Sequence, residues 1–200
     1  MNNMSWHHID YQRIIDLYYP EDNAQKRILT VHSRSVADKA LRIIDNHPEW
    51  QMDKTFVEAA AMLHDIGIVG CDAPGIQCFG SQPYICHGRI GAEMLRNLPH
   101  HIDISSLGID EETLQRLARV CERHTGAGIS REDVIIQQLP LPEEDFLPET
   151  LEEQLICYAD KFFSKTKLTK EKTVEQAKNS LAKFGSEGVN RFKQWVSLFE

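Results

Sequence analysis

The sequence predicts an all-α fold, and three observations lead to that prediction. Apolar residues recur three and four positions apart along almost the whole chain, which is the period of an amphipathic helix. No segment alternates apolar and polar residues as a half-buried strand does. The chain also contains no internal repeat and no low-complexity tract. Together these features predict a bundle of helices without a significant sheet.

Length and composition are those of one globular domain. The 200 residues are 42% hydrophobic and 26% charged, which is ordinary for such a domain. We predict a single domain over residues 1–200, with a core at 25–165 and the terminal helices packed on it. The net charge of −8 disfavours a general nucleic-acid binder.

Several absences in the sequence predict a cytoplasmic protein without membrane association. No apolar run reaches membrane-spanning length, and the N-terminal residues lack the basic start and apolar core of a signal peptide. The five cysteines are an odd number without a regular framework, as expected of reduced thiols. A homodimer is left open.

The first two predicted helices occupy the N-terminal quarter of the chain. Residues 6–19 form the first, which Pro20 ends, and residues 22–46 form a long amphipathic second. His32 lies four residues after Ile28 on the apolar face of the second helix, so it points inward. The alternative for His32 is a core histidine bonded to a carbonyl.

Other histidines are expected to lie in solvent. They are His7 and His8 near the terminus, His47 in a helix break, and the pair His100 and His101 in a turn.

A short helix ends in a histidine and an aspartate. Asp53 can cap its start and Gly67 can close its end. His64 falls on the same face as Val57 and is therefore buried, and Asp65 follows directly. Both are metal ligand types, although such a pair by itself is more often a local hydrogen bond.

The segment 69–86 is rich in glycine, proline and cysteine, and it predicts an irregular loop. We expect it to be a lid that borders the site. The alternative is a zinc knuckle of Cys71, Cys78 and Cys86, but their spacing contains no C-x-x-C.

Three further segments place ligand-type residues on apolar faces. His87 opens one helix, and His124 continues the apolar stripe of a helix over residues 110–125. A capping box at Thr150 starts a helix that carries Asp160 among apolar residues. A buried aspartate is costly unless it is paired or binds a cation.

The remaining segments carry no ligand-type residue on an apolar face. A capping box at residues 130–133 starts a short helix, and residues 139–148 are proline-rich and extended. Residues 165–172 hold four lysines and are predicted to be a solvated connection. Two packing helices, 174–184 and 189–199, finish the chain.

Five predicted helices thus each direct a ligand-type group inward, which suggests one shared polar centre. Its members are His32, His64, Asp65, His87, His124 and Asp160. This set can hold two metal ions, with Asp65 as the bridge because a carboxylate has two oxygens. If these six residues had only a structural role, each side chain would form hydrogen bonds with nearby backbone groups rather than meet the others. No Ser-His-Asp arrangement, strand-associated glycine-rich phosphate loop or H-E-x-x-H helix competes with this reading.

The order of these residues resembles the HD superfamily of metal-dependent phosphohydrolases. Residues 63–67, LHDIG, match its HDIG subgroup, and His87 and His124 resemble the members with two metals. The surrounding stretches 31–37, 87–93 and 158–161 strengthen the match. Residues 122–129, ERHTGAGI, also resemble a small uncharacterised prokaryotic HDIG family. The resemblance covers residues 25–165 and implies a helical HD domain, with the C-terminal helices as additions.

The resemblance implies a reaction and a ligand set. His32, His64, Asp65 and Asp160 would hold one ion, and Asp65, His87 and His124 a second. The expected reaction is hydrolysis of a phosphate ester or anhydride, with a nucleotide as the expected substrate, by a metal-activated water. Asp65 and His64 are the predicted catalytic residues. Iron, manganese, zinc, nickel and cobalt all suit such ligands, and magnesium is left open.

Four cations near the ligands are candidates to bind substrate phosphate: Arg34, Arg89, Arg123 and Lys161. The alternative for each is an ordinary surface charge. The general acid is not identified, and Glu93 and a metal-bound water are the candidates.

Departures from the resemblance narrow the function, and two alternatives remain. No GYP motif occurs and no lysine follows Asp65 closely, which argues against a cyclic-di-GMP enzyme. A mixed-valence diiron oxygenase would use the same ligand order. A non-catalytic nucleotide sensor would not need the full ligand set.

Overall fold

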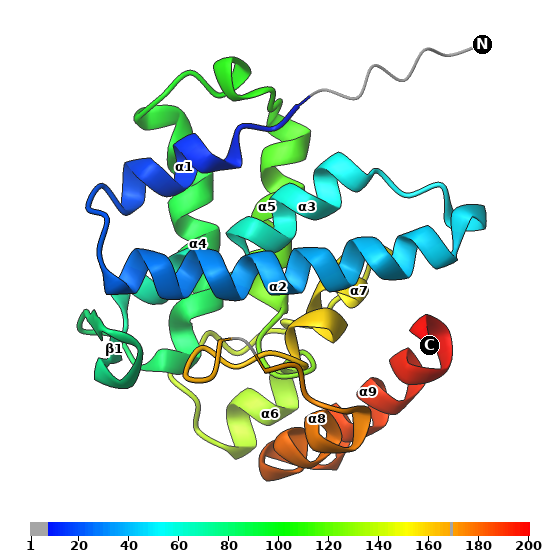
Figure 1. Cartoon of the computed structure of the whole chain (residues 1–200). Coiled ribbons are helices and arrows are strands. Elements are labelled where there is room, and N and C mark those ends of the chain that lie inside the picture. The colour runs from blue at the N-terminus through cyan, green and yellow to red at the C-terminus, as the bar shows by residue number, and fades with distance from the viewer. Residues whose placement is uncertain (1–7, 169) are drawn as a thin grey trace.

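The computed structural model describes residues 8–168 and 170–200, and in that part of the chain the predicted all-α fold is confirmed (Figure 1). The α-helices are α1 (Tyr11–Tyr18), α2 (Ala24–Asn46), α3 (Lys54–Leu63), α4 (His87–Arg96), α5 (Glu111–Arg123), α6 (Arg131–Ile136), α7 (Leu151–Asp160), α8 (Val174–Leu181) and α9 (Ser186–Phe199). Short 3₁₀ helices span Pro48–Trp50, Ile66–Gly70, Pro74–Ile76, Tyr84–Cys86, Leu98–His100, Ile104–Leu107 and Ala182–Phe184. Two strands of two residues, β1 (Asp72–Ala73) and β2 (Cys78–Phe79), form an antiparallel hairpin.

The long helix α2 is the central element of the bundle. In Figure 1 it crosses the molecule in front of α4 and α5, and it packs against α3 and α7. Asn23 caps it by accepting a hydrogen bond from the Lys26 N–H, which satisfies a donor that the first helical turn leaves free. Its buried face includes Leu29, His32 and Val36, as the periodicity predicts.

Helices α3, α4 and α5 form a compact group beside α2. Asp53 caps α3, and the helix ends at Leu63, directly before His64 and Asp65. The following 3₁₀ helix, Ile66–Gly70, packs on α4, which in turn packs on α5. Every residue from 59 to 68 is buried, so the His-Asp pair lies inside the bundle.

Helix α9 covers the outer side of α7. Phe192 is fully buried and stacks on Tyr158, with ring centroids 5.3 Å apart, and Phe199 lies 5.2 Å from the same ring. Arg191 donates hydrogen bonds to the carbonyls of Ala127 and Gly128 at 2.7 and 2.9 Å. The C-terminal helices are therefore attached both to α7 and to the loop that follows α5.

Two local predictions need correction, and a third concerns a residue that the structure does not describe. The first helix starts at Tyr11 rather than residue 6, because Asp10 accepts from the Arg13 N–H and caps it there. His7, one of the histidines expected in solvent, lies outside the described residues. At the start of α7, Thr150 accepts from the Glu153 N–H, but the Glu153 carboxylate accepts from the Glu149 N–H instead of completing the box.

The segment 69–86 is more ordered than an irregular loop, because it contains the hairpin, two 3₁₀ helices and the end of a third. Its cysteines do not converge in the structure. Cys71, Cys78 and Cys86 donate to different backbone carbonyls, those of Gly67 or Pro83, Ile76 and Pro140, at 3.3–3.9 Å. Among the described residues, the groups able to hold a metal contain no cysteine, so the zinc-knuckle alternative has no support.

Within residues 8–168 and 170–200, no helix combines the length and the apolar character needed to cross a membrane.

Candidate metal centre

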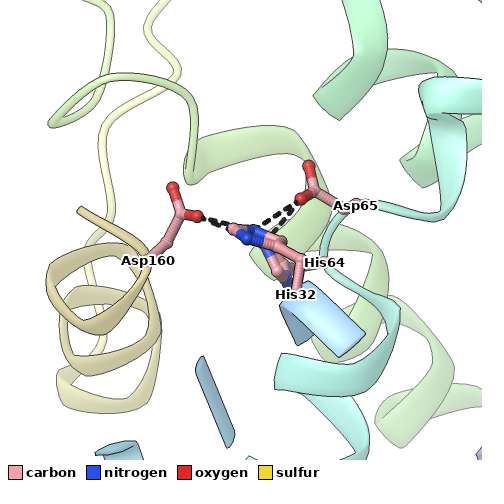
Figure 2. Close-up of side chains that lie close together, drawn as sticks. All are labelled: His32, His64, Asp65 and Asp160. Atoms are coloured by element: carbon pink, nitrogen blue, oxygen red, sulfur yellow. Dashed lines mark ion pairs between the residues drawn. The ribbon is translucent and has the colours of Figure 1, made fainter. Parts of the chain in front are cut away.

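The first ligand group brings together side chains from two helices and the turn after α3. His32 comes from α2, His64 and Asp65 follow α3, and Asp160 ends α7 (Figure 2). The Nε2 atoms of His32 and His64 each lie 3.0 Å from Asp65 Oδ2. The same two nitrogens lie 3.0 and 3.6 Å from Asp160 Oδ1. One ion could therefore contact all four side chains.

The second group shares Asp65 with the first. His87 at the start of α4 and His124 at the end of α5 place their Nε2 atoms 3.4 and 3.3 Å from Asp65 Oδ1. The two Nε2 atoms are 3.0 Å apart. Oδ2 faces the first group and Oδ1 the second, so the structure brings the six predicted residues together with Asp65 between the groups.

Backbone contacts orient three of the four histidines in the same way. His64, His87 and His124 each place Nδ1 2.6–2.7 Å from the carbonyl three residues earlier. Since a carbonyl only accepts, Nδ1 must carry the proton in each ring. The Nε2 lone pair is then free and points toward the centre, which is how metal-binding histidines are commonly held.

The donor set fits a metal ion because several of its buried atoms are otherwise unsatisfied. Among the described residues, the buried atoms without a hydrogen-bond partner include both ring nitrogens of His32, Nε2 of His64 and both carboxylate oxygens of Asp65. Asp65 Oδ2 does have an ion-pair contact, with Lys165 Nζ at 2.6 Å. Buried polar atoms are costly without partners, and a divalent cation would satisfy them together.

The electrostatics of the centre favour the ligand forms of most of these groups. Burial opposes ionisation of Asp65, but His64 and Lys165 outweigh it and lower the pKa of Asp65 well below its usual value. Burial and the neighbouring His124 lower the pKa of His87 to about 3, so its ring is neutral. His64 differs, because the carboxylates of Asp65 and Asp160 overcome burial and raise its pKa to about 9.

A glycine contact places His87 beside the His-Asp turn. A Cβ on Gly67 would lie 2.2 Å from the His87 carbonyl oxygen and 2.3 Å from the Gly91 nitrogen. Only glycine therefore allows the turn to approach the backbone of α4 this closely. The approach brings Asp65 and His87, which are 22 positions apart, to the same point.

A cavity of about 550 Å³ opens onto the centre, a volume typical of small-molecule sites. His87, His124 and Asp160 line it, so the metal groups lie at one side of it. Its other walls combine apolar and cationic side chains from the turn before α4, the loop after α5, the segment after α7 and the C-terminal helices. They include Ile85, Ile129, Phe163, Leu181, Phe184, Lys161, Lys165, Lys172 and Arg191.

The four predicted phosphate-binding cations lie in different places. Lys161 lines the cavity, and its Nζ is 2.6 Å from Asp160 Oδ2. Arg34, Arg89 and Arg123 are absent from the cavity wall and pair with Glu58, Glu93 and Glu149, respectively. Glu93, a candidate general acid, is exposed and is also absent from that wall. Substrate binding by these cations stays a prediction.

The prediction that residues 165–172 are a solvated connection is wrong for two of their lysines. Lys165 is 12% exposed, and its Nζ lies 2.6 Å from Asp65 Oδ2. Lys172 also lines the cavity, where its Nζ donates to the Lys161 carbonyl at 3.2 Å. Four lysines in a short segment resemble an exposed run in sequence, and nothing local signalled that the run folds back over the centre.

The end of the segment expected to be a lid reaches the cavity. Tyr84 and Ile85 line it, and the Tyr84 ring stacks on His87 with centroids 4.6 Å apart. The hairpin residues earlier in the segment are not part of the cavity wall. Whether this segment restricts substrate choice stays a prediction.

Comparison with known proteins adds three observations. A family model described as HD domain matches residues 29–164. The uncharacterized protein MJ0778 of Methanocaldococcus jannaschii is 36% identical over 138 residues, which cover 68% of this chain and 66% of that protein. No solved structure matches.

Two further relatives are named tRNA (cytidine(56)-2′-O)-methyltransferase. The protein of Picrophilus torridus is 35% identical over 143 residues, which cover 72% of this chain and 33% of that protein. That of Thermoplasma volcanium is 31% identical over 161 residues, which cover 80% and 38%, respectively. The chain thus spans about a third of these two relatives and just under two thirds of MJ0778.

Proposed function

The chain belongs to the HD domain family, and we propose that it is a metal-dependent phosphohydrolase that acts on a small phosphorylated molecule, with a nucleotide as the expected substrate. One observation carries the proposal: two groups of metal-ligand side chains share Asp65 at the edge of a cavity that lysines line. The methyltransferase activity of two relatives is not proposed here, because the match covers only about a third of each.

The residues divide between two ions as follows. His32, His64, Asp65 and Asp160 would hold one, and Asp65, His87 and His124 the other. When bound at such a site, divalent metals supply a water of lowered pKa and positive charge for the phosphate oxygens. Neutral imidazoles and carboxylates suit several transition metals, so the donor set does not select one.

The chain's own residues supply the remaining functions. The backbone carbonyls that bind the three histidine Nδ1 atoms hold the rings in fixed orientations. Lys161, which lines the cavity beside Asp160, provides positive charge where the reacting phosphate of a substrate would lie. The apolar wall residues exclude water from that space and offer a surface to the organic part of the substrate.

The test is metal analysis followed by a substrate panel. The purified protein is loaded separately with manganese, iron, cobalt, nickel, zinc or magnesium and is then assayed on phosphate monoesters, diesters and nucleotides. We expect at least one metal to support phosphate release, and His64→Ala to abolish it. His100→Ala is the matched control, because His100 is exposed and belongs to neither ligand group.

Two outcomes would replace the proposal. Oxygen consumption by the iron-loaded protein without phosphate release would favour the diiron oxygenase. Tight nucleotide binding without turnover under any metal would favour a sensor.

A further inference from the structure

Three lysines converge on one side of the metal centre. Lys161 Nζ lies 2.6 Å from Asp160 Oδ2, and Lys165 Nζ lies 2.6 Å from Asp65 Oδ2. Lys172 Nζ donates to the Lys161 carbonyl at 3.2 Å, which places it beside the other two. All three line the cavity. A chain with a net charge of −8 thus gathers cations at this one place.

The carboxylates near these lysines have other roles. Asp65 and Asp160, which Lys165 and Lys161 contact, both belong to the metal-ligand groups. Asp133 also lines the cavity, but its Oδ2 accepts from the Ser130 hydroxyl at 2.7 Å and the Ser130 N–H at 3.1 Å. Lys172 has no carboxylate within 4.0 Å among the described residues. With ions in place, the cavity would carry a surplus of positive charge.

This surplus of positive charge favours a substrate that carries more negative charge than a single reacting phosphate. We propose that Lys165 and Lys172 form an anion subsite beside the metal centre, which binds a phosphate of the substrate other than the one that reacts. This inference rests on the proposed phosphohydrolase function. It narrows the substrate class to molecules with two or more phosphate groups, such as nucleoside diphosphates, triphosphates or bisphosphates.

The remaining cavity walls fit the organic part of such a molecule. Phe163, Leu181 and Ile129 provide apolar surface, and Phe184 is 63% exposed between α8 and α9. Helices α8 and α9 both lie beyond the residues that match the family model. The C-terminal addition therefore completes a wall of the cavity.

The kinetic test compares substrates that differ by one phosphate. With the metal-loaded protein, we expect kcat/KM for a nucleoside diphosphate to exceed that for the matching monophosphate by about tenfold or more, the size expected of one charge-assisted contact. Lys172→Gln should remove about tenfold from the diphosphate value and change the monophosphate value less than about twofold. Lys170→Gln is the matched control, since Lys170 is exposed and outside the cavity wall.

A binding measurement separates this inference from the proposed function. Calorimetry with the manganese-loaded protein should show pyrophosphate binding about tenfold more tightly than phosphate, with the difference lost in Lys172→Gln and retained in Lys170→Gln. That pattern without turnover of any substrate would keep the subsite and reject the hydrolase. Turnover with equal kcat/KM for both substrates, and equal binding of both anions, would reject the subsite alone. Lys172→Met provides a second variant for both measurements if Lys172→Gln does not fold.

Discussion

Among the described residues, Asp65 is the member that the two ligand groups share. Its Oδ2 faces His32 and His64, and its Oδ1 faces His87 and His124 at 3.3–3.4 Å. Loss of this residue should therefore affect two ions, whereas loss of an outer histidine should affect one. The position of Asp65 between the groups therefore predicts which ligand variants lose the most metal.

We expect Asp65→Ala to lose most bound metal and all measurable turnover. His87→Ala should retain about one ion and lose turnover by several orders of magnitude, because two ions are needed to generate and orient the nucleophile. The measurement is metal stoichiometry beside phosphohydrolase activity for both variants. Full activity of Asp65→Ala would contradict the mechanism, and equal metal loss in both variants would indicate a single shared site.

Protonation of His64 should make metal binding depend on pH. In the metal-free protein, Asp65 and Asp160 outweigh the effect of burial and raise the pKa of His64 to about 9, from 6.5. A ligand histidine must be neutral, so binding displaces this proton. We expect metal affinity, measured by chelator competition, to rise from pH 6.5 to 9 with proton release into a weak buffer. Affinity that does not change over this range would contradict the expectation.

The same shift predicts how the stability of the metal-free protein varies with pH. The folded-state pKa lies above the unfolded one, so protonation of His64 stabilises the fold fully below pH 6.5. This contribution is lost as the pH rises through 9. Urea denaturation in the presence of a chelator should show a fall in the free energy of unfolding between these values, and a rise attributable to His64 would contradict the assignment.

The close approach between the turn after α3 and the start of α4 depends on Gly67. Its hypothetical Cβ meets backbone atoms of His87 and Gly91, which cannot move without shifting α4. We expect Gly67→Ala to destabilise the protein by about 1–3 kcal/mol through overpacking. Because α4 carries His87, the variant should also bind the second metal more weakly.

Gly75→Ala is the matched control for this prediction. A Cβ on Gly75 would have nothing within 4 Å, so its effect should stay within about 0.5 kcal/mol. Thermal denaturation and metal stoichiometry of the two variants give the comparison. Equal stability of the Gly67 and Gly75 variants would show that the close approach can relax.

Helix α9 packs on α7 and therefore supports the position of Asp160. Phe192 is 0% exposed and packs against the rings of Tyr158 in α7 and Phe162 just after it. Phe192→Ala should cost about 3–5 kcal/mol, the range for truncating a buried phenylalanine. Leu198→Ala on the same helix is the control, because Leu198 is 39% exposed and should change stability little.

Denaturation of these two variants in the presence and absence of metal tests whether α9 supports the site. If it does, the Phe192 variant should also bind metal more weakly at Asp160, because α7 loses its cover. An unchanged metal affinity beside a large loss of stability would confine α9 to a packing role.

The helical fold could be predicted from the sequence, and so could the six residues that the structure brings together around Asp65. Helical periodicity is a local property, so the apolar faces of α2, α5 and α7 can be read without the fold. A histidine or aspartate on such a face is an anomaly visible in one dimension, as His32 and Asp160 show. The HD resemblance then joined these separate anomalies into one site, and the structure brings all six together.

Which cations face the cavity could not be predicted from the sequence. Arg34, Arg89 and Arg123 lie close to ligands in sequence, yet each pairs with a glutamate outside the cavity wall. Lys165 belongs to a polar connection in the sequence, yet it contacts Asp65, which is 100 positions away. The physical reason is that a long charged side chain suits water or a paired site equally well, so its sequence pattern does not distinguish them. The path of the chain over the metal centre therefore determines which cations face the cavity.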